Sequence, residues 1–284
     1  MGVRRAVELA CAQAGYSGAE QGARAVCTLG PLIHNPRVLD DLKRRGIGIL
    51  DESNLPECLS DMTVIIRAHG TGPQTEGELH RRGARIIDAT CPKVKASQLK
   101  AALLAEAGYR IFIAGEESHA EIAGIKKYAG TGTLVVSNAA EAEKAAAALS
   151  QKNSAAVKTA LLAQTTISEE EYQAIGDAIT RYFPDLEIIR TICSATKERQ
   201  DSLRKLLPCV DALIIAGGKE SANTRRLCTI AQSSGKPYIL AETAAEIPHG
   251  FCKYATIGLA AGASTPEWVI DEIESKLKSM NSAG

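Results

Sequence analysis

The sequence predicts an α/β protein built from small parallel β-sheets, and two features of the chain support this. Short apolar runs rich in Val and Ile alternate with longer amphipathic stretches along the 284 residues. Such runs are typical of strands buried on both faces, and their alternation with helices indicates βαβ units. The expected strands cover residues 64–66, 85–87, 109–113, 160–162, 186–189, 212–215, 237–240 and 255–259.

Several stretches between these runs have the composition of helices. Residues 93–107 and 141–148 are rich in Ala and contain neither Gly nor Pro, so nothing interrupts a helix there. Residues 170–183 also predict a helix, which Pro184 ends. A further helix is expected to cover residues 3–14, close to the start of the sequence.

The composition argues against several classes of protein. The 33 Lys and Arg residues balance 33 Asp and Glu residues, so no overall charge attracts nucleic acid or an anionic membrane. No window approaches ~18 uninterrupted apolar residues and no export signal is visible, so we expect a cytoplasmic protein with reduced thiols. The eight cysteines contain no Cys-x-x-Cys pair, which argues against a zinc ribbon.

Small and polar residues follow strand after strand, before the next helix begins. In open parallel sheets, ligands bind beyond the carboxyl ends of the strands. Cys91 and Cys193 lie at such junctions, where a helix N-terminus favours a thiolate by ~0.3–1 kcal/mol. Both are therefore candidate metal ligands. Three other cysteines lie within helical patterns and are predicted to be buried, inert thiols: Cys11, Cys209 and Cys228.

The spacing of the two junction cysteines indicates an internal repeat. Cys91 and Cys193 are about a third of the chain apart, which fits three comparable α/β units, each opening with a cysteine. We expect domains at residues 1–90, 91–190 and 191–284. The first of these would lack its N-terminal strand and its cysteine.

Nine short motifs follow one another along the chain. They are Gly2-Val3-Arg4-Arg5-Ala6-Val7, Ile33-His34-Asn35, Ala68-His69-Gly70, Asp88-Ala89-Thr90-Cys91-Pro92, Ser118-His119-Ala120-Glu121 with Gly124, Gln164-Thr165-Thr166, Cys193-Ser194-Ala195-Thr196 with Arg199-Gln200, Ser221-Ala222-Asn223-Thr224 with Arg226-Leu227, and Ala261-Gly262-Ala263-Ser264-Thr265-Pro266. In this order they resemble the motifs of the 4-hydroxy-3-methylbut-2-enyl diphosphate reductase family, also called LytB/IspH. One such match would be weak, but nine in order are specific.

The resemblance implies three pseudo-symmetric α/β domains around a central [4Fe–4S] cluster, and hence an iron–sulfur oxidoreductase. The implied activity is reductive dehydroxylation of 4-hydroxy-3-methylbut-2-enyl diphosphate to isopentenyl and dimethylallyl diphosphate, the last step of the non-mevalonate isoprenoid pathway. The implied electron donor is a ferredoxin or flavodoxin in the bacterial cytoplasm. Neither nucleic acid nor a membrane is expected as a partner.

The same resemblance implies roles for individual residues. Cys91 and Cys193 would be two of three cluster ligands, Glu121 the proton donor, and Thr165 a hydrogen-bonding partner of the substrate hydroxyl. His119 would lie beside Glu121 and the substrate. Half a dozen donors at ~1.5–3 kcal/mol each could hold a diphosphate. The side chains expected to bind the substrate are His34, His69, His119, Thr165, Ser221, Asn223 and Ser264.

Two departures from the family pattern affect this interpretation. The third cluster cysteine is expected just upstream of Met1, since the family places it two residues before the glycine that is Gly2 here. Cys11 cannot substitute, because it lies about nine residues along a helix, ~13 Å away. Ala222 replaces a family serine and is expected to remove one diphosphate contact.

Two other interpretations stay open. One is a homologue that has no competent cluster and binds a diphosphate without reductase activity; coding sequence upstream of Met1 would separate it from the reductase. The other is a generic dinucleotide-binding α/β protein. It is the weaker of the two, because no Gly-x-Gly-x-x-Gly follows a first strand.

Overall fold

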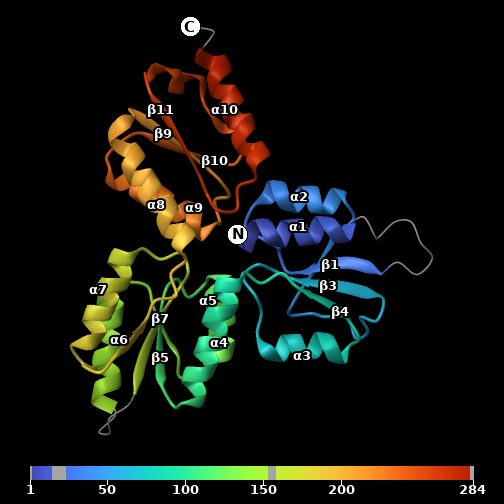
Figure 1. The fold of residues 1–284 in the computed structure, drawn as a ribbon, viewed down its shortest axis with the longest axis vertical. Coiled ribbons are helices and arrows are strands. Elements are labelled where there is room, and N and C mark those ends of the chain that lie inside the picture. The colour runs from blue at the N-terminus through green and yellow to red at the C-terminus, as the bar shows by residue number, and fades with distance from the viewer. Residues whose placement is uncertain (1, 15–23, 153–157, 282–284) are drawn as a thin grey trace. The chain divides into compact units, whose positions relative to one another are not determined.

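A computed structural model describes residues 2–14, 24–152 and 158–281. It contains three small parallel sheets, as expected, and they have four, four and three strands (Figure 1). The chain forms two compact units. Unit 1 comprises Met1–Leu32 and Ile47–Cys193, and unit 2 comprises Ile33–Gly46 and Ser194–Gly284. Among the described helices, none combines the length and the apolar character needed to cross a bilayer.

The first sheet belongs to unit 1 and has the strand order β2-β1-β3-β4. Its elements are α1 (Gly2–Ala14), β1 (Ala25–Leu29), β2 (Gly48–Leu50), β3 (Met62–Ile66), α3 (Pro73–Arg81) and β4 (Arg85–Asp88). Leu29 and Val64, from the two central strands, pack with Leu79 of α3 in one buried cluster. Burial of such side chains, at about 25 cal/mol per Å² of apolar surface, holds the helix on the sheet.

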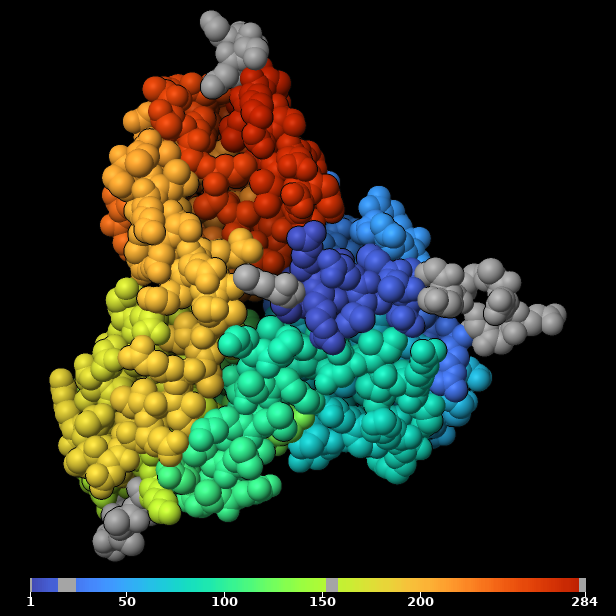
Figure 2. Space-filling view, in the orientation of Figure 1, coloured from blue at the N-terminus to red at the C-terminus, as the bar shows by residue number. Residues whose placement is uncertain are grey.

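The second sheet, also in unit 1, has the order β6-β5-β7-β8 and is covered on both faces (Figure 1). Its elements are α4 (Pro92–Glu106), β5 (Arg110–Ala114), α5 (Ala120–Ala129), β6 (Leu134–Val136), α6 (Ala139–Lys152), β7 (Thr159–Ala163), α7 (Glu169–Thr180) and β8 (Glu187–Ile189). Along β5, Ile111 and Ile113 pack with α4 and α5. Phe112 and Ala114 point the other way and pack with α6 and α7. Figure 2 shows this part of unit 1, coloured green to yellow, on the face that is in view.

The third sheet belongs to unit 2 and has the order β10-β9-β11. The elements of unit 2 are α2 (Pro36–Arg44), α8 (Ser194–Leu206), η1 (Leu207–Cys209), β9 (Ala212–Ala216), α9 (Ala222–Ser233), β10 (Tyr238–Ala241), η2 (Ala244–Glu246), η3 (His249–Lys253), β11 (Ile257–Ala261) and α10 (Glu267–Asn281). Leu213 of β9 packs with Leu227 of α9. Ile214, its neighbour, packs with Ile273 of α10 on the opposite face.

The three sheets repeat one order of strands. In each, the first strand in chain order lies between the second and the third. A helix precedes each sheet and begins at Gly2, directly after Cys91, or directly after Cys193. This repeat supports the expectation of three related α/β units. The strands of each sheet lie within one of the predicted domains, whose boundaries stay a prediction.

All eight predicted strands form, but three strands were not predicted. β2 and β6 have three residues each, too few to show a pattern, and β1 carries a Thr and a Cys among its apolar residues. The helix predicted over residues 170–183 ends at Thr180. The prediction that Cys209 is buried is wrong: it is exposed, because it follows Pro208 in a 3-10 turn rather than lying on a helix face.

A buried tyrosine on α7 offers a test of this packing. The Tyr172 hydroxyl lies 2.8 Å from the carbonyl oxygen of Leu161 and 2.7 Å from that of Ile189, on adjacent strands. We expect Tyr172→Phe to lower the free energy of unfolding by about 1–2 kcal/mol in urea, because a buried hydrogen bond is lost. Tyr182→Phe, at a half-buried tyrosine just beyond α7, is the control and should change it by less than about 0.5 kcal/mol. Equal effects of the two substitutions would contradict this account.

Candidate active site

A buried carboxyl group lies where β5 and β7 end. Glu121 is in the first turn of α5 and is 2% exposed. Thr165, which follows β7, donates its backbone N–H to Glu121 Oε1 (2.7 Å) and its hydroxyl to Oε2 (2.8 Å). Both carboxyl oxygens therefore have a donor from one residue, 44 positions away in the chain.

These surroundings bring the pKa of Glu121 close to neutral pH. Burial raises it, the two hydrogen bonds from Thr165 lower it, and burial prevails, so that the pKa lies at about 7. The carboxyl group is thus present in both protonation states near pH 7. An acid of this kind can donate a proton to a leaving group under physiological conditions.

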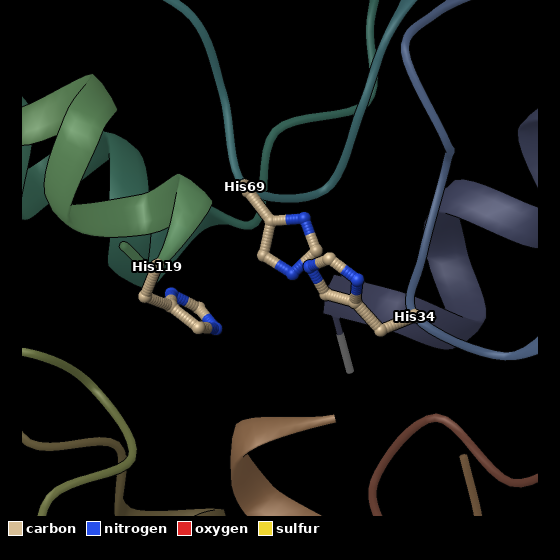
Figure 3. A group of neighbouring side chains, drawn as sticks. All are labelled: His34, His69 and His119. Carbon is tan, nitrogen blue, oxygen red and sulfur yellow. The ribbon is translucent and has the colours of Figure 1, made fainter. Parts of the chain in front are cut away.

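A pair of histidines lies at the start of α5, the helix that carries Glu121. His119 is the N-cap of α5, and its Nδ1 accepts a hydrogen bond of 3.2 Å from the backbone N–H of Glu121. An accepting Nδ1 carries no proton, so the neutral ring has its proton on Nε2. The ring of His69 stands edge to face against that of His119, with the centroids 5.4 Å apart (Figure 3).

The backbones of the two junction cysteines are hydrogen-bonded to the loops that carry His69 and Thr165. The backbone N–H of Cys91 donates to the carbonyl oxygen of Ala68, next to His69, and that of Cys193 donates to the carbonyl oxygen of Thr165, both at 2.9 Å. Both thiols are free and half-buried. One continuous path of contacts within unit 1 therefore joins the two cysteines through His69, His119, Glu121 and Thr165.

The first helix begins against one of these thiols. A Cβ placed on Gly2 would collide with Sγ of Cys91. The N-terminus of α1 and the N-terminus of α4 therefore meet at the Cys91 side chain. Only glycine allows α1 to start this close to the thiol.

Gln98, on α4, was not identified from the sequence as part of the site. It is fully buried, and its Nε2 lies 3.5 Å from the carbonyl oxygen of Thr71. A Cβ on Gly70, whose φ is +74°, would collide with this amide, and a Cβ on Gly124 would lie 3.0 Å from it. The glycines of two motifs thus make room for Gln98, and they are the signal that could have indicated it.

The glutamine of the Gln164-Thr165-Thr166 motif has a structural role. Gln164 is 1% exposed, and its Oε1 accepts a hydrogen bond from the backbone N–H of Glu116 (2.9 Å). Its Nε2 donates to the hydroxyl of Thr166 (2.9 Å). The side chain of Gln164 thus holds the loop after β5 against the loop after β7, and so sets Thr165 against α5.

Unit 2 brings a second group of the predicted residues together. Asn35 caps α2, and its Nδ2 donates to the carbonyl oxygen of Ser264 (3.1 Å). Ser264 Oγ lies 3.4 Å from Oγ of Ser221, the N-cap of α9. A Cβ on Gly218 would collide with the carbonyl oxygen of His34, so that loop also approaches closely. The loops after β9 and β11 and the start of α2 therefore converge.

The amide of Asn223 is the least satisfied polar group in this cluster. Asn223 is 5% exposed, and neither its Nδ2 nor its Oδ1 has a hydrogen-bond partner among the described residues. A buried polar group left unpaired costs about 1–3 kcal/mol. An amide that is buried and unpaired at a helix N-terminus is typical of a site that binds a ligand. Ala222, the departure from the family serine, is buried beside it.

Every predicted site residue thus lies in one of two groups. Unit 1 brings together Cys91, Cys193, His69, His119, Glu121 and Thr165, and unit 2 brings together His34, Ser221, Asn223 and Ser264. The predicted position of a third cysteine, upstream of Met1, lies outside the described residues. The fold and these groups define an α/β protein with a buried acid, two thiols and a set of hydroxyl, amide and imidazole groups at the ends of its strands.

Comparison with known proteins assigns the family. A family profile described as LytB protein matches residues 1–278. The chain is 44% identical over 278 residues to 4-hydroxy-3-methylbut-2-enyl diphosphate reductase of Treponema denticola, covering 97% of this chain and 94% of that protein. It is 37% identical over 282 residues to the reductase of the same name from Aquifex aeolicus, covering 98% and 92%. The chain belongs to the LytB protein family.

Solved structures agree with this assignment. The fold is similar to that of the E-1-hydroxy-2-methyl-but-2-enyl-4-diphosphate reductase from Plasmodium falciparum, with a TM-score of 0.85 and 26% identity over 96% of this chain and 83% of that one. A second solved structure, described as the terminal enzyme of the non-mevalonate pathway, is 36% identical with a TM-score of 0.69 and covers 98% and 95%. The resemblance seen in the nine motifs is confirmed.

The raised pKa of Glu121 predicts a pH-dependent stability. The folded pKa, about 7, exceeds the unfolded value of about 4.3, so the stability that protonated Glu121 contributes is present below pH 4.3 and lost as the pH rises through 7. Glu121→Gln removes this loss while preserving shape. We expect the free energy of unfolding of the variant, relative to wild type, to rise by about 2–3 kcal/mol between pH 5 and pH 8 in urea titrations.

The exposed Glu117 supplies the matched control for that titration. Glu117→Gln should leave the free energy of unfolding, relative to wild type, constant over the same pH range. A flat profile for Glu121→Gln would show that the carboxyl group ionises near its ordinary pKa.

Proposed function

We propose that this protein reduces 4-hydroxy-3-methylbut-2-enyl diphosphate to isopentenyl and dimethylallyl diphosphate, the last step of the non-mevalonate isoprenoid pathway. The overall reaction consumes two electrons and two protons, breaks one C–O bond, forms one C–H bond and releases water. The observation that carries the proposal is the buried Glu121, with its pKa of about 7 and its two hydrogen bonds from Thr165. The names of the relatives, all reductases of this kind, support the choice of substrate.

Glu121 and Thr165 serve the hydroxyl that leaves. When Glu121 is protonated, its O–H can donate to Thr165 Oγ1, 2.8 Å away, which frees the threonine proton for the substrate oxygen. The proton then passes from Glu121 through Thr165 to the leaving hydroxyl, which departs as water. Hydroxide is a poor leaving group, so this proton is needed in the step that breaks the C–O bond.

The histidines and the group of polar side chains in unit 2 bind the diphosphate. His119 has its proton on Nε2, on the side of the ring away from Glu121 N–H, and His69 stands against it. Ser221 and the unpaired amide of Asn223 lie at the N-terminus of α9, where backbone N–H groups and the helix dipole favour an anion. We assign His34 and Ser264 to the same anion.

The thiols suit an iron–sulfur cofactor. Cys91 and Cys193 are free, half-buried and placed at helix starts, which fits two thiolate ligands. The third ligand would be a cysteine upstream of Met1, since α1 begins against the Cys91 thiol at Gly2. When bound, a [4Fe–4S] cluster would supply the electrons and a Lewis acid. A ferredoxin or flavodoxin would reduce it in the bacterial cytoplasm, where thiols stay reduced.

Cluster ligation can be tested with the chain extended upstream by its natural coding sequence. After anaerobic reconstitution, Cys91→Ser and Cys193→Ser should each lose most of the visible thiolate-to-iron absorption and reductase activity, because one ligand is gone. Cys58→Ser, at an exposed cysteine, should keep both. If the extended wild-type protein binds no cluster and reduces no substrate, the proposed function is wrong. Diphosphate binding alone would favour the homologue without reductase activity.

The proton-donor role predicts a pH–rate profile. Because protonated Glu121 is the active form, kcat should fall as the pH rises through about 7. Glu121→Gln should lower kcat by about 10²-fold or more and abolish this limb of the profile. The same limb in Glu121→Gln would assign the proton to another group.

A further inference from the structure

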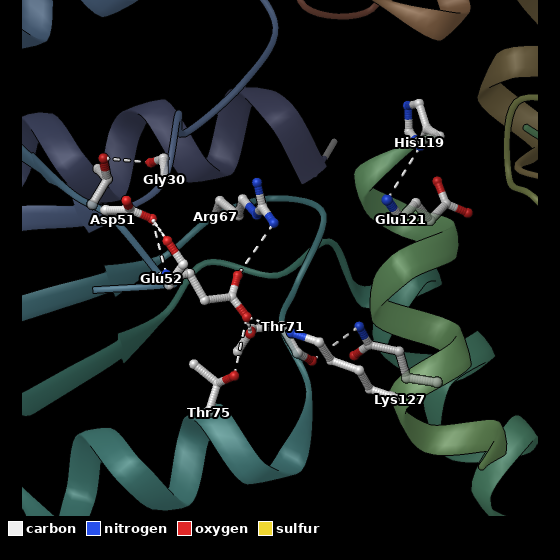
Figure 4. A network of polar contacts seen from close by, with 12 residues as sticks. Gly30, Asp51, Glu52, Arg67, Thr71, Thr75, His119, Glu121 and Lys127 are labelled. Atoms are coloured by element: carbon white, nitrogen blue, oxygen red, sulfur yellow. Dashed lines mark hydrogen bonds and ion pairs between the residues drawn. The ribbon is translucent and has the colours of Figure 1, made fainter. Parts of the chain in front are cut away.

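Glu52 lies in the loop after β2, outside all nine motifs, and is the centre of a polar network in unit 1 (Figure 4). Its Oε1 accepts hydrogen bonds from the hydroxyls of Thr71 (2.8 Å) and Thr75 (3.0 Å) and from Nζ of Lys127 (2.5 Å). Its Oε2 accepts from Nη2 of Arg67 (3.4 Å). One carboxylate therefore binds two cations and two hydroxyls.

Three of these donors come from the two segments that carry the histidine pair, whereas Thr75 belongs to α3. Arg67 and Thr71 stand on either side of His69, two residues away in each direction. Lys127 belongs to α5, whose N-cap is His119. The carboxylate thus connects the loop of one histidine to the helix of the other.

The side chain of Lys127 passes close to the backbone of the His69 loop at Gly72. A Cβ on Gly72 would collide with the Lys127 side chain, so only glycine leaves room for it. The side chain crosses this glycine to reach Glu52, which is 22% exposed. Burial alone would raise the pKa of Glu52, but the hydrogen bonds and the charge of Lys127, with the hydroxyls of Thr71 and Thr75, outweigh it and lower that pKa. The link is therefore ionic at neutral pH.

We propose that Glu52 is a positioning residue of the active site, which holds the His69 loop against α5 and so fixes the edge-to-face pair of His69 and His119. The effect on diphosphate binding rests on the proposed function, whereas the role of Glu52 in holding His69 against His119 does not. Without the carboxylate, Arg67 and Lys127 lose their shared anionic partner, and the loop loses this ionic link to α5.

The neighbouring lysine on the same helix gives a matched control. Lys126 forms its ion pair with Glu117, which is 64% exposed and lies in the loop just before α5. That pair therefore links α5 only to the residues just before it. Lys126→Met and Lys127→Met remove the same charge from adjacent positions, and only the second breaks the link to the His69 loop.

The experiment compares Glu52→Gln, Lys127→Met, the double variant and Lys126→Met in the full-length protein. Ring ¹H–¹⁵N NMR spectra report His69 and His119 without need of turnover. We expect both ring signals to shift in Glu52→Gln and in Lys127→Met, with no further shift in the double variant, and neither to move in Lys126→Met. If both rings keep their signals in Glu52→Gln and in Lys127→Met, the proposal is overturned.

Kinetics add a second readout. We expect KM for the diphosphate substrate to rise about tenfold in Glu52→Gln and Lys127→Met, because misplaced histidines bind it less well. A purely structural defect would lower the active fraction and the apparent kcat and leave KM unchanged, and that result would overturn the proposal. Should Glu52→Gln fail to fold, Lys127→Met decides alone, since Lys127 is 42% exposed and its removal leaves no buried charge. A wild-type protein that turns over nothing would refute the proposed function, while the NMR comparison would still decide the role of Glu52.

Discussion

The pair of hydrogen bonds from Thr165 to the buried carboxyl group of Glu121 is the interaction on which the rest of the site depends. It joins the loop after β7 to the helix after β5, at the edge of the sheet where parallel strands end. Each partner has a second contact: Glu121 N–H binds His119, and the carbonyl oxygen of Thr165 binds Cys193 N–H. Removing the pair would therefore uncouple the acid and its histidine on α5 from the Thr165 loop that is hydrogen-bonded to Cys193.

The energetics of this pair explain why the acid is useful. A buried carboxylate without partners would be too costly to ionise near neutral pH, and an exposed one would lose its proton near its ordinary pKa of about 4.3. At Glu121 burial outweighs the two hydrogen bonds, and the pKa lies at about 7. The two donors of Thr165 also fix the orientation of both carboxyl oxygens, so the proton leaves from a defined position. Burial and orientation here have the same cause, the packing of α5 against the loop after β7.

Much of this site could be predicted from the sequence, because its residues lie where strands end. The apolar runs indicated β5, β7, β9 and β11, and the residues just beyond them include His119, Thr165, Ser221 and Ser264. The ordered set of motifs then separated Glu121 from the exposed glutamates of the chain, which the residue taken alone could not do. Of the five histidines, the two outside every motif, His80 and His249, are exposed.

The residues that hold the site in place could not be predicted in the same way. Gln98 lies inside a helix and Glu52 follows a strand of three residues, so neither has a local pattern. Their roles arise from contacts 27 and 75 positions away in the chain, with Thr71 and Lys127. The sequence signals that remain are glycines: Gly70 makes room for Gln98, and Gly72 makes room for Lys127, the partner of Glu52. The reactive residues of the site can thus be identified from motifs, whereas the residues that hold them in place are set by tertiary packing.

The most direct test of this account is to titrate the Glu121 carboxyl group itself. Carbon-detected NMR of ¹³C-labelled protein between pH 4 and pH 9, with the signal assigned by its loss in Glu121→Gln, would follow its ionisation. We predict a midpoint near pH 7 in the wild type, and a higher midpoint in Thr165→Val, which lacks the hydroxyl that favours the ionised form. A wild-type midpoint near pH 4.5, unchanged in Thr165→Val, would contradict the account.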